Sequence, residues 1–140
     1  MKFWDSSALV PLLLEETTTT QLRSILVSDP DLSIWWGSRV ECVSAISRLE
    51  RMQELELGQA IEILSQGRVL FDSAVEVPPS HILRDLACRL LRVHALSAAD
   101  ALQLAAALVL CEQEPEGLEL VSLDERLREA AGREGFPVLP

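Results

Sequence analysis

The chain has 140 residues, of which 49% are hydrophobic and 24% are charged. This composition fits one globular domain with its own hydrophobic core, and it excludes a disordered or fibrous protein. Twelve basic residues against 22 acidic ones give a net charge of -10. Such a charge excludes broad, nonspecific binding to a nucleic-acid backbone, because that binding needs many positive charges.

The sequence contains no segment typical of membrane insertion or secretion. The longest run without a charged or strongly polar residue, 104–111, is far shorter than the ~20 apolar residues that span a bilayer. Asp5 interrupts the one apolar segment near the N-terminus that could serve as a signal peptide. Cys42, Cys88 and Cys111 form no C-x-x-C pair, so we expect reduced core residues rather than metal ligands or disulfides. We expect an intracellular, cytoplasmic protein.

Hydrophobic patterning predicts strands that alternate with helices. Short β-rich runs bounded by Asp, Pro or Gly predict the strands, and apolar residues at helical spacing predict the helices. The predicted strands are 2–4, 32–36, 74–77, 118–122 and 135–139, and the predicted helices are 6–14, 17–28, 38–52, 57–70, 82–92, 97–112 and 124–133.

This alternation predicts an α/β fold. The sequence has no repeat and no linker long enough to divide it, so we expect residues 1–140 to form a single domain. Helices that connect parallel strands pack on both sides of the sheet. The prediction is therefore a mainly parallel central sheet with helices on both faces.

Carboxylates recur where predicted strands end and helices begin. Asp5 ends the first strand, Glu41 lies in the first turn after the second, and Asp124 follows the strand 118–122. Asp100 is the one charge in an apolar stretch, where we expect it to be desolvated. Ligands of α/β folds bind beyond the carboxyl ends of the strands. Four carboxylates meeting there would suit a hard cation such as Mg²⁺ or Mn²⁺ rather than zinc.

Each acid also has a purely structural interpretation. Ser38-x-x-Glu41 and Ser97-x-x-Asp100 match a capping box or its shorter variant. Asp124 precedes an arginine by four residues, which is the spacing of a surface ion pair. Capping does not explain why the one charge of the most apolar helix coincides with acids at strand ends. The four acids together therefore favour a metal site.

Other residues have simpler interpretations. Trp35 and Trp36 are adjacent in a predicted strand and point to opposite faces, so at least one belongs to the core. His94 extends an apolar helical stripe and is expected to be a partly buried structural histidine. The sequence contains no G-x-x-x-x-G-K-[ST] loop and no G-x-G-x-x-G turn, which excludes the usual phosphate cradles for nucleotides.

Four segments carry the acids in an ordered pattern. They are Phe3-Trp4-Asp5-Ser6-Ser7-Ala8-Leu9, Val40-Glu41-Cys42-Val43-Ser44-Ala45-Ile46-Ser47-Arg48, Leu96-Ser97-Ala98-Ala99-Asp100-Ala101-Leu102-Gln103-Leu104-Ala105, and Leu120-Val121-Ser122-Leu123-Asp124 followed by Gly135-Phe136-Pro137-Val138. In order and spacing they resemble the motifs of PIN-domain nucleases, most closely the toxins of VapBC-type toxin–antitoxin pairs. Ser122 stands where Thr is usual in the family, and Gln103 stands where many members have His.

The resemblance implies a PIN fold and Mg²⁺- or Mn²⁺-dependent hydrolysis of RNA phosphodiester bonds by the toxin of a type II toxin–antitoxin system. It implies that Asp5 and Asp100 hold the principal ion. Glu41 would orient a water molecule or bind the metal directly, and Asp124 would complete a second, weaker position.

Further residues are candidates for support and for substrate contact. Ser6, Ser7 and Ser122 are candidates for hydrogen bonds to the carboxylates. Arg48 is a candidate for a contact with an RNA phosphate, although arginines on a solvated helix face are the more common case. Arg39 and Arg51 lie on the same predicted helix and have the same two interpretations.

The implied partners are an RNA substrate and a small VapB-type antitoxin that covers the acidic pocket with a C-terminal segment. The family also suggests a homodimer within a larger toxin–antitoxin complex. Two alternatives stay open: a housekeeping PIN nuclease in RNA processing without an antitoxin, and a non-catalytic α/β interaction module.

Overall fold

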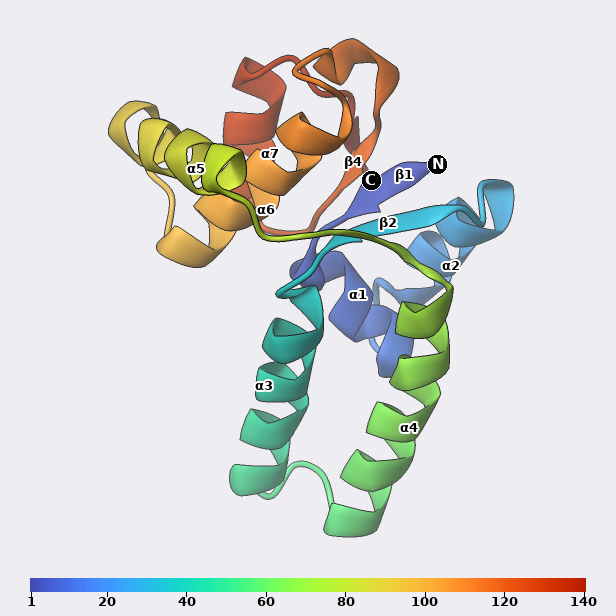
Figure 1. The fold of residues 1–140 in the computed structure, drawn as a ribbon. Coiled ribbons are helices and arrows are strands. Elements are labelled where there is room, and N and C mark those ends of the chain that lie inside the picture. Colours follow the sequence, from blue (N-terminus) through green and yellow to red (C-terminus); the bar gives the residue numbers. More distant parts are fainter.

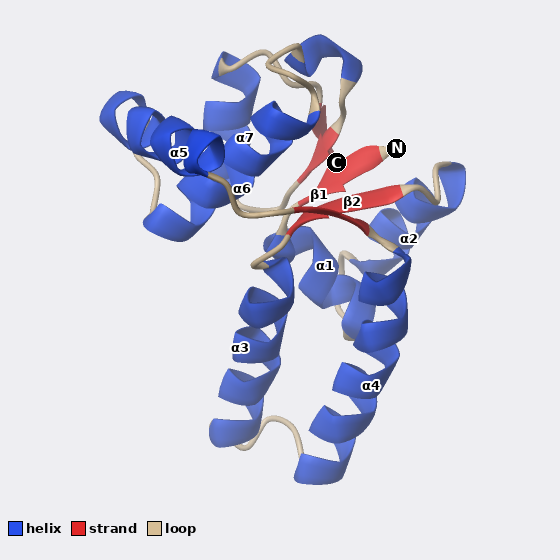
Figure 2. Cartoon of the chain, viewed as in Figure 1, coloured by secondary structure: helices blue, strands red, loops and turns tan.

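A five-stranded parallel sheet forms the centre of the computed structural model, which describes all residues 1–140 (Figures 1 and 2). Its strands are β1 (Lys2–Trp4), β2 (Leu32–Trp35), β3 (Val75–Val77), β4 (Leu120–Val121) and β5 (Val138–Leu139). Their order is β3-β2-β1-β4-β5, and every neighbouring pair is parallel. The predicted parallel sheet is confirmed, and the short segment after residue 74 is one of its edge strands.

Seven α-helices connect or flank these strands. They are α1 (Ser6–Leu13), α2 (Thr19–Ser28), α3 (Ser38–Arg51), α4 (Leu57–Ser73), α5 (His81–Val93), α6 (Ala98–Leu110) and α7 (Glu125–Arg133), with one short 3₁₀ turn at Pro115–Gly117. The sequence did not predict the 3₁₀ turn. It also predicted the last two strands as five residues long, whereas only two residues of each pair with a neighbour. None of the helices combines the length and apolar character that crossing a membrane requires.

Helices cover both faces of the sheet, as predicted (Figure 2). Successive strand residues point to opposite faces, so each face has its own core. Phe3 and Trp35 pack with α5, α6 and α7 in an apolar cluster of 18 buried residues. Trp4 and Ile34 pack on the other face with residues of α1, α2 and α4. Trp35 is 7% exposed and Trp36 is 54% exposed, which confirms that one of the two tryptophans belongs to the core.

Helix α6 has more buried residues than any other helix and lies within the first of these cores. Seven of its residues are buried, from Ala101 to Leu108. Four of these seven are alanines, whose small side chains let α5 pack closely on this helix. The N-terminal turn of α6 lies at the carboxyl edge of the sheet, so Asp100 in this turn also lies there.

Helices α3 and α4 form a hairpin that projects from the sheet (Figure 1). Arg39 on α3 joins the base of this hairpin, since its Nη1 lies 2.9 Å from Asp72 Oδ1 and its Nε lies 2.6 Å from Glu76 Oε1. The helices approach α1 closely at Gly67, where a Cβ would lie 3.1 Å from a methyl group of Leu13. The hairpin is therefore held against α1 and the edge of the sheet.

The cysteines only partly follow the prediction. All three are free thiols, but Cys88 is exposed and Cys111 is half-buried. The prediction that all three cysteines belong to the core is therefore wrong for Cys88, which lies on the outer face of α5. Cys42 is buried as predicted, and burial raises the pKa of its thiol to about 12.

His94 follows α5 and is a structural residue, as predicted. Its side chain is 6% exposed, and its Nε2 lies 2.7 Å from Glu134 Oε1 just beyond α7. Burial opposes ionisation of Glu134, but hydrogen bonds from His94 and Arg89 hold the pKa of this carboxyl below its usual value. This pair ties the end of α5 to the end of α7.

The strand order reverses in the middle of the sheet. From β1 the sheet continues through β2 to β3 on one side, and through β4 to β5 on the other. The carboxyl ends of β1 and β4 lie side by side at this reversal, which is where open α/β sheets bind ligands. Asp5 directly follows β1, and Ser122 directly follows β4.

Candidate functional site

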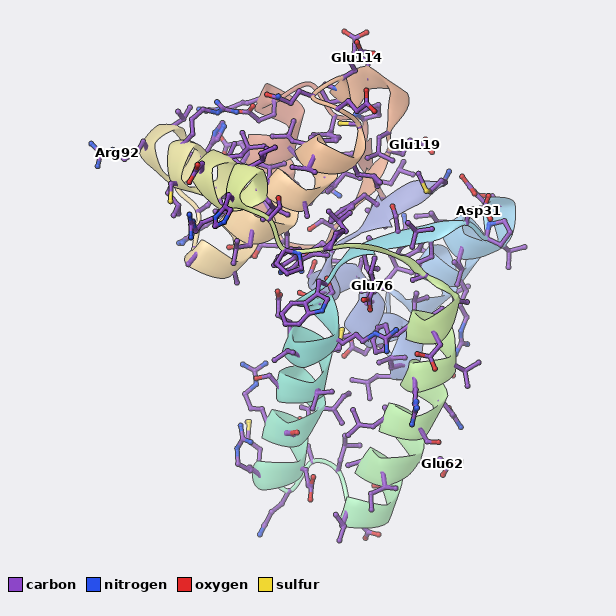
Figure 3. All side chains as sticks on the ribbon, viewed as in Figure 1. Asp31, Glu62, Glu76, Arg92, Glu114 and Glu119 are labelled. Carbon is purple, nitrogen blue, oxygen red and sulfur yellow. The ribbon has the colours of Figure 1, made fainter.

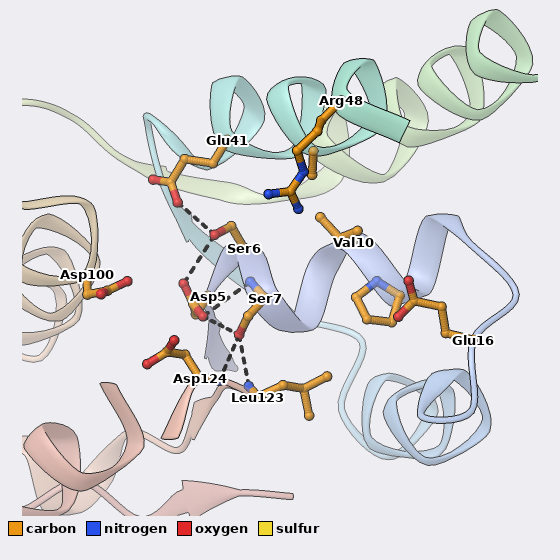
Figure 4. A pocket seen from close by; sticks show the side chains of 12 residues that line it. Asp5, Ser6, Ser7, Val10, Glu16, Glu41, Arg48, Asp100, Leu123 and Asp124 are labelled. Atoms are coloured by element: carbon orange, nitrogen blue, oxygen red, sulfur yellow. Dashed lines mark hydrogen bonds between the residues drawn. The ribbon is translucent and has the colours of Figure 1, made fainter. Parts of the chain in front are cut away.

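The four predicted acids line one open pocket of about 370 Å³ at this edge of the sheet (Figure 4). Asp5 follows β1, and Glu41 lies in the first turn of α3. Asp100 lies in the first turn of α6, and Asp124 precedes α7. Residues up to 119 positions apart in the sequence therefore converge because the parallel sheet brings its carboxyl ends to one edge.

Asp5 is the most deeply buried of the four acids, with 2% of its surface exposed. Its Oδ2 accepts hydrogen bonds from the Ser7 hydroxyl, from Ser7 N at 3.2 Å and from Ser122 Oγ at 2.9 Å. Burial raises the pKa of Asp5 above its ordinary value, while these hydrogen bonds oppose the rise. The carboxyl group of Asp5 is thus fixed in orientation but lacks a positive partner.

Ser7 and Ser122 connect the segment after β1 to the segment after β4. Ser7 Oγ accepts hydrogen bonds from Leu123 N at 2.9 Å and Asp124 N at 3.2 Å. Ser122 is fully buried, and its Oγ lies 3.2 Å from Ser7 Oγ. Both serines therefore hold Asp5 and also fix the backbone that carries Asp124.

Glu41 is held by residues from two other helices. Its Oε2 accepts a hydrogen bond from Ser6 Oγ at 2.7 Å, and its Oε1 accepts one from Gln103 Nε2 at 3.1 Å. Burial raises the pKa of Glu41, and the negative charges of Asp5 and Asp100 act in the same direction. The predicted serine contacts with the carboxylates are therefore present at both Asp5 and Glu41.

The capping-box interpretation of Glu41 is wrong. The N-cap residue of α3 is Gly37, which has no side chain that could form a capping hydrogen bond. Ser38 instead exchanges hydrogen bonds with Gln103, at 3.1 and 3.3 Å. Glu41 consequently points toward the pocket rather than back onto its own helix.

Gln103 is the site residue that the sequence did not identify as functional. It is fully buried in α6 and bonds both Ser38 and Glu41. One signal was available, since a polar amide in an otherwise apolar helix must find hydrogen-bond partners when buried. The hydrogen bond that the Gln103 amide donates orients the Glu41 carboxylate.

Asp100 does form a capping box, but it also lines the pocket. Its backbone N–H donates to Ser97 Oγ at 3.1 Å, and its Oδ2 accepts from the Ser97 hydroxyl at 2.6 Å. The expectation that Asp100 is strongly desolvated is wrong, because its turn lies at the open end of α6 and its side chain is partly exposed. Asp5 is the desolvated acid instead.

Asp124 caps α7 through a hydrogen bond from Leu127 N to its Oδ1 at 2.8 Å. The proposed ion pair with Arg128 is absent, because that guanidinium donates to the carbonyls of Ser122 and Pro140. One carboxylate oxygen of Asp124 therefore serves the helix, and the other accepts no hydrogen bond from the chain and faces the pocket (Figure 4).

Arg48 is the only basic residue that lines the pocket. It reaches from α3 toward α1 (Figure 4) and has no acidic partner within 4 Å. Arg39 is not available for a phosphate, because Asp72 and Glu76 bind its guanidinium. The substrate role suggested for arginines of this helix is thus excluded for Arg39.

The side chains that line the pocket supply oxygen donors for a metal ion. No three His, Cys, Asp or Glu side chains form a ready-made ligand cluster. All the candidate donors are nevertheless carboxylate and hydroxyl oxygens, which suit hard cations such as Mg²⁺ and Mn²⁺. Burial raises the pKa of Asp5 and of Glu41 and so disfavours their charged forms, which a divalent cation would stabilise. The chemistry of the residues therefore fits such an ion.

The chain is similar in sequence and fold to known proteins. It matches the family model of the PIN domain over residues 2–133, whereas no curated protein sequence matches it. Three solved structures share its fold. A toxin–antitoxin complex from Klebsiella pneumoniae is 15% identical with a TM-score of 0.69, and the alignment covers 100% of this chain and 97% of that one. PAE2754 from Pyrobaculum aerophilum is 22% identical with a TM-score of 0.65, covering 92% and 78%. FitAcB from Neisseria gonorrhoeae is 14% identical with a TM-score of 0.66, covering 100% and 97%.

Proposed function

The chain belongs to the PIN-domain family, and on that basis we propose that it is a Mg²⁺- or Mn²⁺-dependent endoribonuclease and the toxin of a type II toxin–antitoxin pair. The observation that carries this proposal is the convergence of Asp5, Glu41, Asp100 and Asp124, from four parts of the fold, in one open pocket that Glu16 also lines. A non-catalytic α/β module would have no reason to gather and orient these charges, whose mutual repulsion opposes folding. The similarity of fold to a toxin–antitoxin complex supports the toxin role.

In this proposal the carboxylates hold the cation. Asp5 and Asp100 bind the principal ion, Glu41 binds it or orients a water molecule, and Asp124 completes a weaker position. When bound, the cation supplies positive charge that attracts an RNA phosphate and stabilises the extra negative charge of the transition state. No covalent intermediate with the protein is required.

The chain's own contacts keep the acids in place for this reaction. Ser7 and Ser122 fix the Asp5 carboxylate, while Ser6 and Gln103 fix the carboxylate of Glu41. These contacts hold the oxygens in position before substrate binds, so little reorganisation accompanies the reaction.

The cleavage test replaces each principal acid by its amide. We expect Asp5→Asn and Asp100→Asn each to abolish cleavage of RNA in Mg²⁺ or Mn²⁺, because each removes a ligand charge at almost constant volume. Asp124→Asn should be milder. Asp31→Asn is the matched control, since Asp31 is exposed beyond the opposite edge of the sheet (Figure 3). Cleavage by either principal variant near the wild-type rate would overturn the assignment of the site.

The toxin role has a separate test in cells. Expression of the wild-type chain alone should arrest bacterial growth, the Asp5→Asn variant should be harmless, and coexpression of a VapB-type antitoxin should restore growth. Harmless expression of an active nuclease would instead favour a housekeeping enzyme of RNA processing. The proposal also includes a cytoplasmic location, where the RNA is, and a homodimer within the larger toxin–antitoxin complex.

A further inference from the structure

The net charge of -10 means that the chain needs a local set of positive charges to hold an RNA strand. Most of its basic side chains are already neutralised. Seven of the twelve pair with a carboxylate: Lys2, Arg23, Arg39, Arg68, Arg84, Arg89 and Arg133. Arg128 is engaged by two backbone carbonyls.

Four arginines therefore remain with neither an ion pair to a carboxylate nor a hydrogen bond to the backbone. They are Arg48, Arg51, Arg92 and Arg126. Arg126 lies in a separate groove of about 300 Å³ that shares no lining residue with the carboxylate pocket. Arg92 points into solvent at the far side of α5 (Figure 3). Only Arg48 and Arg51 line a hollow that shares residues with the carboxylate pocket.

These two arginines line a second hollow, of about 450 Å³, on the flank of α3. We call it the α3 hollow, and its lining residues are Ser6, Val40, Glu41, Ser44, Ala45, Arg48 and Arg51. Four of these, Ser6, Glu41, Ala45 and Arg48, also line the carboxylate pocket. The two hollows are therefore parts of one cleft, which is acidic at one end and basic at the other.

The register of α3 explains the basic end. Val40, Ser44, Arg48 and Arg51 are spaced by four, four and three residues, so they form one stripe along the helix. The stripe is ~16 Å long at 1.5 Å per residue, several times the ~3.4 Å rise per nucleotide of a stacked strand. It offers two guanidinium groups and a hydroxyl to phosphates, and the exposed Val40 side chain to a sugar or base.

We infer that the α3 hollow binds the RNA backbone next to the scissile phosphate, with Arg51 and Arg48 contacting the neighbouring phosphates. This inference rests on the proposed nuclease function, which places the scissile phosphate at the carboxylates. A continuous strand leaving that point along α3 brings its next phosphates to the unpaired guanidinium groups.

The test measures how RNA binding depends on salt. All proteins carry Asp5→Asn, which prevents cleavage and removes most metal binding equally from every protein, and the probe is a fluorescent single-stranded oligoribonucleotide. Each lost phosphate contact should reduce the slope of log K against log salt by about 0.7. We expect this reduction for Arg51→Gln and twice as much for the double variant with Arg48→Gln. Arg92→Gln, which removes an equally unpaired charge outside the cleft, should leave the slope unchanged. Equal slopes for Arg51→Gln and Arg92→Gln would overturn the inference.

Cleavage kinetics give an independent readout in a chain with Asp5 intact. Arg51→Gln should raise KM about 5-fold at low salt, equivalent to ~1 kcal/mol, with kcat within about twofold of the wild type. A fall in kcat at unchanged KM would overturn the binding role. Unchanged RNA binding combined with weaker binding of an antitoxin would assign the hollow to a protein partner instead. Failure of the wild type to cleave RNA would overturn the proposed function, whereas the salt dependence tests the α3 hollow by itself.

Discussion

Replacing Asp5 with Asn is expected to remove most of the thermal stabilisation that Mn²⁺ gives the wild-type chain. A ligand that binds only the folded state adds ~2.7 kcal/mol at a hundredfold excess over its Kd. With an unfolding entropy of ~2.1 cal/mol/K per residue, 140 residues give ~0.29 kcal/mol/K, so the expected rise in Tm is ~9 °C. The Asp5→Asn variant lacks the most buried of the proposed ligands and should retain only a small part of this shift.

The same variant should behave differently without metal. Burial raises the pKa of Asp5 above its unfolded value of 3.8, so above the folded pKa the ionised carboxylate destabilises the folded state. Below pH 3.8 the carboxyl is protonated in both states, and this cost vanishes. In EDTA at pH 7 the Asp5→Asn variant should therefore melt at or above the wild type, and the difference should shrink as the pH falls toward 4.

Thermal scans with Mn²⁺ and with EDTA provide the measurement, and Asp31→Asn is the control for loss of one exposed negative charge. The control should keep the full Mn²⁺ shift. Equal Mn²⁺ shifts for the wild type and the Asp5→Asn variant would refute the metal-site reasoning, because the buried carboxylate would then take no part in binding the ion.

Three further variants test the contacts around the site and the His94–Glu134 pair. Gln103→Ala should lower kcat for RNA and reduce the free energy of unfolding by about 1–3 kcal/mol, because half-buried Glu41 and buried Ser38 lose a hydrogen-bond partner; unchanged kcat would contradict the positioning role of Gln103. Ser7→Ala removes the acceptor of two backbone N–H groups and should cost about 1–3 kcal/mol in urea denaturation; a neutral effect would show that water replaces the hydroxyl. Glu134→Gln should be less stable by ~1 kcal/mol above pH 4.5, with the difference lost as the pH falls through the lowered folded pKa; a gap in Tm that persists at low pH would contradict this.

The sequence by itself determined the fold class and the position of the acids along it. Short β-rich runs bounded by turn residues predicted the strands, and apolar residues at helical spacing predicted the helices, because each pattern is local. Asp5 and Asp124 were predicted at strand ends on the same local grounds. Since parallel strands bring their carboxyl ends to one edge, the convergence of the acids also followed from the sequence.

Only the tertiary structure decided which acid is buried. Asp100 belongs to the helix with the most buried residues, yet its turn lies at the open end, whereas Asp5 is enclosed by the segments after β1 and β4. Periodicity reports the face on which a residue lies and contains no information about what covers the end of an element. The exposure of Cys88 has a different cause, because this residue lies on the outer face in the middle of α5.

The tertiary structure also decided the partners of polar side chains distant in sequence. Gln103 contacts Glu41, which lies 62 positions earlier in the sequence. Arg39 is neutralised by Asp72 in the last turn of α4 and by Glu76 in β3. Spacing along one helix could not distinguish Arg39 from Arg48 and Arg51, because all three lie on α3. The difference arises from neighbouring elements, whose approach depends on the packing of the whole chain.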